Sequence, residues 1–177
     1  MSCISGHGST AVGEHSQYAT GSGAMTDSNG TTEASPFETL TPEQLTELCG
    51  RGFDGVVGLT YREVTGDIVR AEWDVTPQLH QPAGIMHGGV LCAVVESVAS
   101  IGGSAWFGSR GHVVGVNNST DFLRATRSGS LAAHGHPIHR GRTQQLWQVD
   151  ISDEGGRLVA QGKVRLANIE NTARLGQ

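Results

Sequence analysis

The sequence lacks the usual features of a chain that binds nucleic acid or depends on disulfides. Its formal charge of −5 comes from 12 basic and 17 acidic residues, and the basic residues are scattered instead of clustered. We therefore expect no contact with nucleic acid or an anionic membrane surface. The three cysteines, Cys3, Cys49 and Cys92, lie far apart and form no CxxC pair. This pattern disfavours a disulfide framework and a thiolate zinc site, and it favours a reducing, cytoplasmic location.

Membrane-spanning runs and several catalytic motifs are also missing. The longest predominantly apolar stretch, Met86 to Ser109, is interrupted by an acid, five glycines and several serines. The N-terminus has no basic segment followed by an apolar one, so we expect neither a membrane span nor an export signal. No GxSxG motif, phosphate-binding loop or dinucleotide fingerprint is present, which argues against serine hydrolases and nucleotide-binding enzymes that use those motifs.

The composition predicts one folded domain with a tail at each end. Residues 1–36 are rich in Gly, Ser and Thr, contain no Lys or Arg and have no helical or strand periodicity. Such a segment buries too little apolar surface to offset its ordering entropy, so we predict a disordered tail. Residues 37–170 form the predicted domain, and residues 171–177 form a C-terminal tail.

Local patterns predict a short helix, two strands, a long helix and four strands. Thr41, Pro42 and Gln44 have the N-cap, first-turn and capping-box positions of a helix over residues 42–50. Strand patterns begin at Val56 and include a hairpin around the turn at residues 65–67. Four later strands are predicted at residues 113–123, 131–139, 144–152 and 158–166. Turn residues separate them, so consecutive strands are expected to pair as antiparallel neighbours.

The long helix, predicted from Gly89 to about Trp106, is the most informative element. It is apolar on most sides, as expected for a helix enclosed by a sheet. Glu96 is its only charged residue, and an apolar element is an unfavourable place for an unpartnered carboxylate unless it has a chemical role. The residues around it are small: Gly89, Cys92, Ala93, Ala99, Ser100 and Gly103. This small-residue face fits close packing against a curved sheet or another helix, and it fits a slot for substrate equally well.

The start of this helix suggests how a carbonyl group could be polarised. The first backbone N–H groups of a helix have no intrahelical partner and lie at the positive end of the helix dipole. Gly88 and Gly89 would let a substrate carbonyl approach them, which is the arrangement of an oxyanion hole. A glycine-rich turn that simply enters the helix explains the same pair.

The spacing of these groups predicts a dimer. Gly88 and Glu96 are eight residues apart, about 12 Å along a helix, so one chain cannot apply both to the same carbonyl. If both act on one bond, they come from two chains whose helices run antiparallel across a two-fold axis. Pairing of sheet edges across the same axis would also remove an exposed edge strand.

These residues resemble a known family. The stretch Gln81-Pro82-Ala83-Gly84-Ile85-Met86-His87-Gly88-Gly89, with Glu96 nine residues after the histidine, is similar to the hotdog-fold acyl-CoA thioesterases. Within them it resembles the PaaI-like branch, with the Glu-dependent 4-hydroxybenzoyl-CoA, 1,4-dihydroxy-2-naphthoyl-CoA and enterobactin-pathway proofreading thioesterases. The resemblance covers residues 50 to 168. It implies an α+β hotdog fold, in which a curved antiparallel β-sheet wraps around a long central helix.

The resemblance also implies a role for each matching residue. Glu96 is the catalytic carboxylate, as nucleophile or as general base for water. Gly88 donates its N–H to the carbonyl, Gln81 and His87 are orienting donors, and Ser100 can hold the attacking water. Arg124 and Arg142 occupy positions where the family meets the coenzyme A nucleotide. Ala125 stands where the family often has proline after the arginine, so the loop that presents Arg124 can differ.

The predicted function is hydrolysis of an aromatic or medium-sized acyl-CoA by a homodimer or a dimer of dimers. No metal or redox cofactor is expected, because CoA is part of the substrate. Two alternatives are a hotdog dehydratase or hydratase, which would use a histidine base at carbon, and a non-catalytic acyl-CoA-binding protein.

Other residues have ordinary explanations beside a functional one. A zinc site at His134, His136 and His139 is disfavoured, because strand alternation turns the third histidine to the opposite face and, without a bulge, only two could share an ion. Trp73 and Trp147 are expected in the core, Trp106 in the core or an acyl pocket. We interpret Cys92 as a small apolar filler.

Overall fold

The computed structural model describes residues 36–170, and its elements follow the predicted order. The predicted tails, residues 1–36 and 171–177, lie outside the described residues apart from Pro36. The helices are α1 (Pro36–Thr39), α2 (Pro42–Cys49), α3 (Phe53–Val57) and α4 (Gly88–Phe107), with 3-10 turns η1 (Pro77–Leu79) and η2 (Gly108–Arg110). The strands are β1 (Thr60–Val64), β2 (Val69–Asp74), β3 (Gly111–Phe122), β4 (Ser130–Arg140), β5 (Gln144–Asp153) and β6 (Leu158–Glu170).

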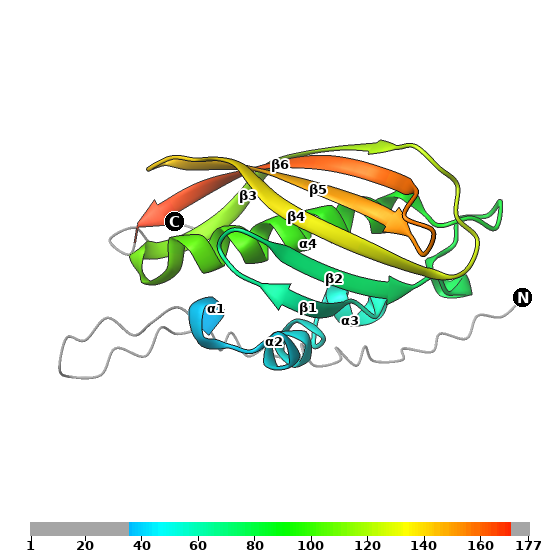
Figure 1. The fold of residues 1–177 in the computed structure, drawn as a ribbon, viewed down its shortest axis with the longest axis horizontal. Helices are drawn as coiled ribbons and strands as arrows, with labels where there is room; N and C mark the ends of the chain where they lie inside the picture. The colour runs from blue at the N-terminus through cyan, green and yellow to red at the C-terminus, as the bar shows by residue number, and fades with distance from the viewer. Residues whose placement is uncertain (1–35, 171–177) are drawn as a thin grey trace, which may run out of the picture. The chain divides into compact units, whose positions relative to one another are not determined.

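The six strands form one antiparallel sheet in the order β1-β2-β4-β5-β6-β3. The sheet curves around α4, which lies against its concave face (Figure 1). Alternate residues of the strands point toward the helix and form the buried core with Val94, Val95 and Val98 of α4. The predicted α+β hotdog architecture is therefore confirmed.

Helix α4 has nearly the predicted bounds. His87 is its N-cap and Gly108, with φ of 59°, follows its last residue. An 18-residue window within the segment Gly88–Arg110 has a mean hydropathy of 1.6, so by length and composition alone this segment could cross a membrane. Because 56% of that apolar window is buried inside the protein, it has the character of a core helix.

The region before β1 differs from the prediction. The strand pattern expected from Val56 begins at Thr60, and Val56 belongs to the short helix α3. Gly58 ends that helix with φ of 77°, and its N–H donates to the Gly55 carbonyl. A five-residue helix is too short to show a helical period, which is why its apolar residues resemble the start of a strand.

The pairing of consecutive strands was also predicted wrongly at one place. Strand β3 pairs with β6 at the edge of the sheet, while β4 pairs with β2. The chain between β3 and β4 crosses the start of α4, where the Met86 N–H donates to the Thr126 carbonyl. The Ser128-Gly129 turn signal is local and cannot report such a crossover.

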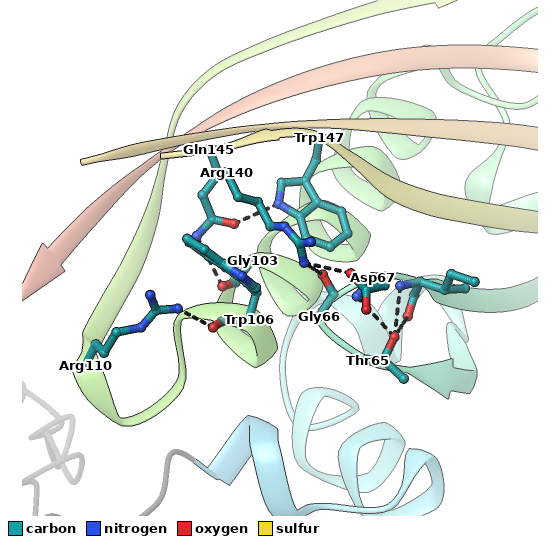
Figure 2. A network of polar contacts seen from close by, with 10 residues as sticks. Thr65, Gly66, Asp67, Gly103, Trp106, Arg110, Arg140, Gln145 and Trp147 are labelled. Carbon is teal, nitrogen blue, oxygen red and sulfur yellow. Dashed lines mark hydrogen bonds and ion pairs between the residues drawn. The ribbon is translucent and has the colours of Figure 1, made fainter. Parts of the chain in front are cut away.

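The C-terminal end of α4 is tied to the sheet by a polar network (Figure 2). The Gln145 side chain is 1% exposed, donates to the Gly103 carbonyl at 3.2 Å and accepts from Trp147 Nε1 at 2.8 Å. Trp147 lies in the core as predicted, and so does Trp73. Trp106 instead stacks under the Arg110 guanidinium, whose central carbon is 4.2 Å from the centroid of the Trp106 ring. Trp106 lies in the last turn of α4, at the opposite end from the helix start. The contact with Arg110 explains how this side chain packs, so no acyl pocket is needed to account for it.

Candidate active site

A cavity of about 650 Å³ opens at the N-terminal end of α4. Its walls come from the segment before α4 and from the end of β3 with the residues that follow. The lining residues are Gln81, Pro82, Ile85, Met86, His87, Gly88, Leu91, Phe122, Leu123, Arg124, Ala125 and Thr126. Three predicted site residues that lie close in sequence, Gln81, His87 and Gly88, therefore share one cavity with Arg124, which comes from a distant segment.

The backbone at the start of α4 leaves one donor free at this cavity. The Gly89 N–H donates to His87 Nδ1 at 2.9 Å, and the Val90 N–H donates to the His87 carbonyl at 3.0 Å. In residues 36–170 the Gly88 N–H has no hydrogen-bond acceptor. Of the two glycines considered from the sequence, only Gly88 can thus offer its N–H to a ligand.

The capping bond also orients the imidazole of His87. Because Nδ1 accepts a hydrogen bond, the neutral ring carries its hydrogen on Nε2. His87 is exposed, so it is not a core histidine, and its Nε2–H can donate to a ligand in the cavity. Gln81, like His87, keeps a free hydrogen-bond donor. Its side-chain carbonyl accepts from the Ala83 N–H at 2.9 Å, so its NH₂ group remains available to donate.

Glu96 does not line this cavity. It is half-buried on α4, about 12 Å along the helix from Gly88, and it faces strand β3. A Cβ atom built on Gly115 of β3 would lie 1.7 Å from Glu96 Oε1, so any side chain at this position would displace the carboxylate. The small-residue face around Glu96 is thus explained in part by close packing against the curved sheet. Ser100 lies one helical turn further on the same helix and is also half-buried.

Sequence reasoning missed the polar partner of Glu96. Asn118 on β3 donates through Nδ2 to Glu96 Oε2 at 3.1 Å and to the Cys92 carbonyl at 2.9 Å. Thr120 donates to Asn118 Oδ1 at 2.7 Å. Twenty-two residues separate Asn118 from Glu96, and no local motif connects them.

The two predicted nucleotide-binding arginines are not brought together in one chain. Arg124 lies between the main cavity and a smaller polar one of about 270 Å³ that also contains Arg127 and Arg157. Arg127 donates to backbone carbonyls and Arg157 pairs with Asp153, whereas the Arg124 guanidinium has no partner within the described residues. Arg142 lies in the β4–β5 turn, where its carbonyl accepts from Asn168. Asn168 also accepts from Gln145, whose amide donates to the Gly103 carbonyl. Gly103 is about 22 Å along α4 from Gly88. Arg142 therefore lies near the opposite end of α4 from the cavity that contains Arg124.

A second polar cluster connects α3 to α4. Asp54 accepts from Ser97, the neighbour of Glu96, at 2.7 Å and from the Tyr61 hydroxyl at 2.8 Å. Burial, with the nearby Asp54 charge, raises the pKa of the Cys49 thiol to about 11. Cys49 is therefore protonated at neutral pH and is a poor nucleophile.

The histidines of β4 are arranged in part as expected. His134 and His136 lie on one face with ring centroids 5.6 Å apart, as predicted. The predicted opposite orientation of His139 is wrong, because a bulge between Pro137 and His139 shifts the register and His139 pairs with Leu146, on the same face of the sheet as His136. Within residues 36–170, no three His, Cys, Asp or Glu side chains come together in a metal-binding group.

Comparison with known proteins agrees with this architecture. Residues 83–160 match the family model described as the thioesterase superfamily. A provisionally named esterase of Mycobacterium tuberculosis is 50% identical over 121 residues, which cover 67% of this chain and 86% of the relative. The solved structure of a thioesterase from Haemophilus influenzae is 32% identical, with a TM-score of 0.73, and the match covers 77% of this chain and 96% of that one. The 1,4-dihydroxy-2-naphthoyl-CoA hydrolase of Escherichia coli is 28% identical over 128 residues, or 72% of this chain and 94% of the relative.

Proposed function

This chain belongs to the thioesterase superfamily, and we propose that it hydrolyses the thioester of an acyl-CoA whose acyl group is aromatic or of medium size. Relatives named as thioesterases and as a naphthoyl-CoA hydrolase support thioester hydrolase activity. The observation that carries the proposal is the free Gly88 N–H on the wall of the 650 Å³ cavity, flanked by the donors of His87 and Gln81. Three donors that line one cavity suit a carbonyl oxygen that becomes negative during attack.

In the proposed reaction Glu96 attacks the thioester carbonyl or removes a proton from the water that attacks it. The Gly88 N–H stabilises the oxyanion, and the carbon–sulfur bond then breaks. If Glu96 is the nucleophile, CoA leaves as the thiolate, takes a proton from water, and the acyl group remains on Glu96 as a mixed anhydride that a water molecule hydrolyses to the free acid. If Glu96 is the base, it passes the proton taken from water to the leaving sulfur, and the free acid and the CoA thiol are released. Ser100, one turn from Glu96, is suited to hold the water. These steps use water and the chain's own groups, with CoA entering as part of the substrate.

We further propose that each site combines two chains. Glu96 lies outside the cavity that contains Gly88, so a second chain has to supply it. Within the described residues, β3 has only β6 as a neighbour, and its other edge is open along 12 residues. An open strand of this length favours pairing with the same strand of a second copy. That pairing supports a homodimer. We propose that two such dimers assemble into a dimer of dimers and that the protein acts in the cytoplasm.

The decisive test of the function is release of free thiol from CoA thioesters. The panel comprises benzoyl, hydroxybenzoyl, naphthoyl, phenylacetyl and fatty acyl groups, and we expect turnover with at least one aromatic or medium-sized member. Tight acyl-CoA binding without turnover of any member would indicate an acyl-CoA-binding protein. Addition or loss of water at the acyl chain, with the thioester intact, would indicate a dehydratase or hydratase.

The role of the Gly88 N–H can be tested with two variants at one position. Gly88→Pro removes the N–H, and proline is tolerated as the first residue of a helix. His87, with φ of −70° and ψ of 129°, has the backbone conformation that a residue before proline requires. We expect kcat to fall about 100-fold.

Gly88→Ala is the matched control, because it adds a Cβ atom and keeps the N–H. That Cβ would lie 2.9 Å from the end of the exposed Phe122 ring, which can rotate away. The alanine variant is expected to keep kcat within about threefold of wild type. Equal losses in the two variants would assign the effect to steric bulk instead of the N–H.

Arg124 is the proposed contact to the CoA nucleotide, since its guanidinium is unpartnered at the junction of the two cavities. Arg124→Gln is expected to raise KM for an acyl-CoA about tenfold, through loss of a charge-assisted hydrogen bond to phosphate. KM for the matching acyl-pantetheine thioester, which has no nucleotide, should not change. Arg165→Gln, on the exposed side of β6, is the control. The contact predicted for Arg142 requires the partner chain, because Arg142 lies near the opposite end of α4.

A further inference from the structure

A β-bulge in β3 places two residues against Glu96 that a regular strand would separate. The pairing of β3 with β6 shifts register between Gly115 and Asn117, so Val116 is the extra residue. Residues three apart in a regular strand point to opposite faces. With the bulge, Gly115 and Asn118 pair with Leu166 and Val164, both fully buried on the helix side of the sheet. Bulges of this kind re-aim side chains and are frequent beside active sites.

Asn118 has a defined amide orientation. Its Nδ2 donates to two acceptors, Glu96 Oε2 and the Cys92 carbonyl, and its Oδ1 accepts from the Thr120 hydroxyl. A reversed amide would direct Oδ1 at a carboxylate and a carbonyl, both of which are acceptors only. The Glu96 carboxylate and the Cys92 carbonyl thus fix which end of the Asn118 amide donates, and the Thr120 hydroxyl holds the other end in place.

The Glu96 carboxylate is confined from two sides by this arrangement. The bare backbone of Gly115 lies against Oε1, and the Asn118 amide holds Oε2. None of the ion pairs in the described part of the chain includes Glu96. A neutral donor orients the carboxylate without pairing it to a positive charge, which suits a group that has to attack carbon or accept a proton.

We propose that Asn118 is a positioning residue for Glu96, with Thr120 fixing the amide that performs this role. The inference rests on the proposed function, because it assigns Glu96 the reaction described above. Asn118 acts through Glu96 and not on the substrate, so its loss should lower kcat with little change in substrate binding.

The test compares three variants in the full-length protein, using the best CoA thioester from the panel. Asn118→Leu keeps the side-chain size and removes both donors, and we expect kcat to fall 10- to 100-fold. Thr120→Val removes only the hydroxyl that orients the amide, and we expect a loss of about threefold to tenfold. The double variant should be no slower than Asn118→Leu, because Thr120 acts only through Asn118.

Two further measurements separate positioning from general structural damage. The dissociation constant for a non-hydrolysable acyl-CoA thioether and the elution volume of the dimer should match those of wild type. A kcat within threefold of wild type for Asn118→Leu, while Glu96→Gln is inactive, would overturn the proposal and leave the proposed function intact. If Asn118→Leu does not fold, a wild-type kcat for Thr120→Val overturns it instead. A wild-type protein that hydrolyses no thioester would remove the proposed function itself.

Discussion

Glu96→Gln is expected to lower kcat for CoA-thioester hydrolysis about a thousandfold. The amide has almost the same shape as the carboxylate and can still accept a hydrogen bond from Asn118, so local packing is preserved. It cannot attack the thioester carbonyl or take a proton from water at neutral pH. The measurement is steady-state thiol release with the best substrate of the panel, together with the elution volume of the dimer.

Glu47→Gln is the matched control for this variant. Glu47 is an exposed carboxylate on α2 whose side chain is 77% accessible, so the same chemical change there should leave kcat unaltered. A Glu96→Gln enzyme that keeps more than about a tenth of the wild-type kcat would exclude Glu96 as nucleophile or general base.

Mixing two inactive variants is expected to restore activity. Each proposed site takes Gly88 from one chain and Glu96 from the other. A dimer of one Glu96→Gln chain and one Gly88→Pro chain therefore contains one intact site and one site with both defects. Random reassembly of equal amounts makes about half of the dimers mixed, so the rate should reach about a quarter of wild type. Each variant alone should show about a hundredth of the wild-type rate or less.

A second mixture provides the control. When wild type is reassembled with a chain that carries both substitutions, each mixed dimer has two damaged sites under the two-chain arrangement. Activity should then fall to about a quarter of wild type, against about a half if every site lies within one chain. No restored activity in the first mixture, with about half in the second, would place each site in a single chain.

Several features of this protein follow from the sequence alone because they depend on neighbouring residues. The capping residues Thr41 and Gln44 predicted the start of α2, and both capping bonds are present. The apolar run after Gly88 predicted α4 nearly to the residue. Helical rise then placed Gly88 and Glu96 too far apart for one carbonyl. Helical period, capping and rise act over about one turn, so a single sequence contains them.

Other features were decided only by tertiary structure. Strand β3 pairs with β6 and not with β4 because the chain crosses the start of α4 between them. The bulge at Val116 turns Asn118 toward Glu96, and no repeat in the sequence marks such an extra residue. Arg124 lines the cavity at Gly88 because its segment, which connects β3 to β4, packs beside the start of α4. Contacts between distant segments depend on which faces bury one another, and that choice is made by the whole sheet as it closes on the helix.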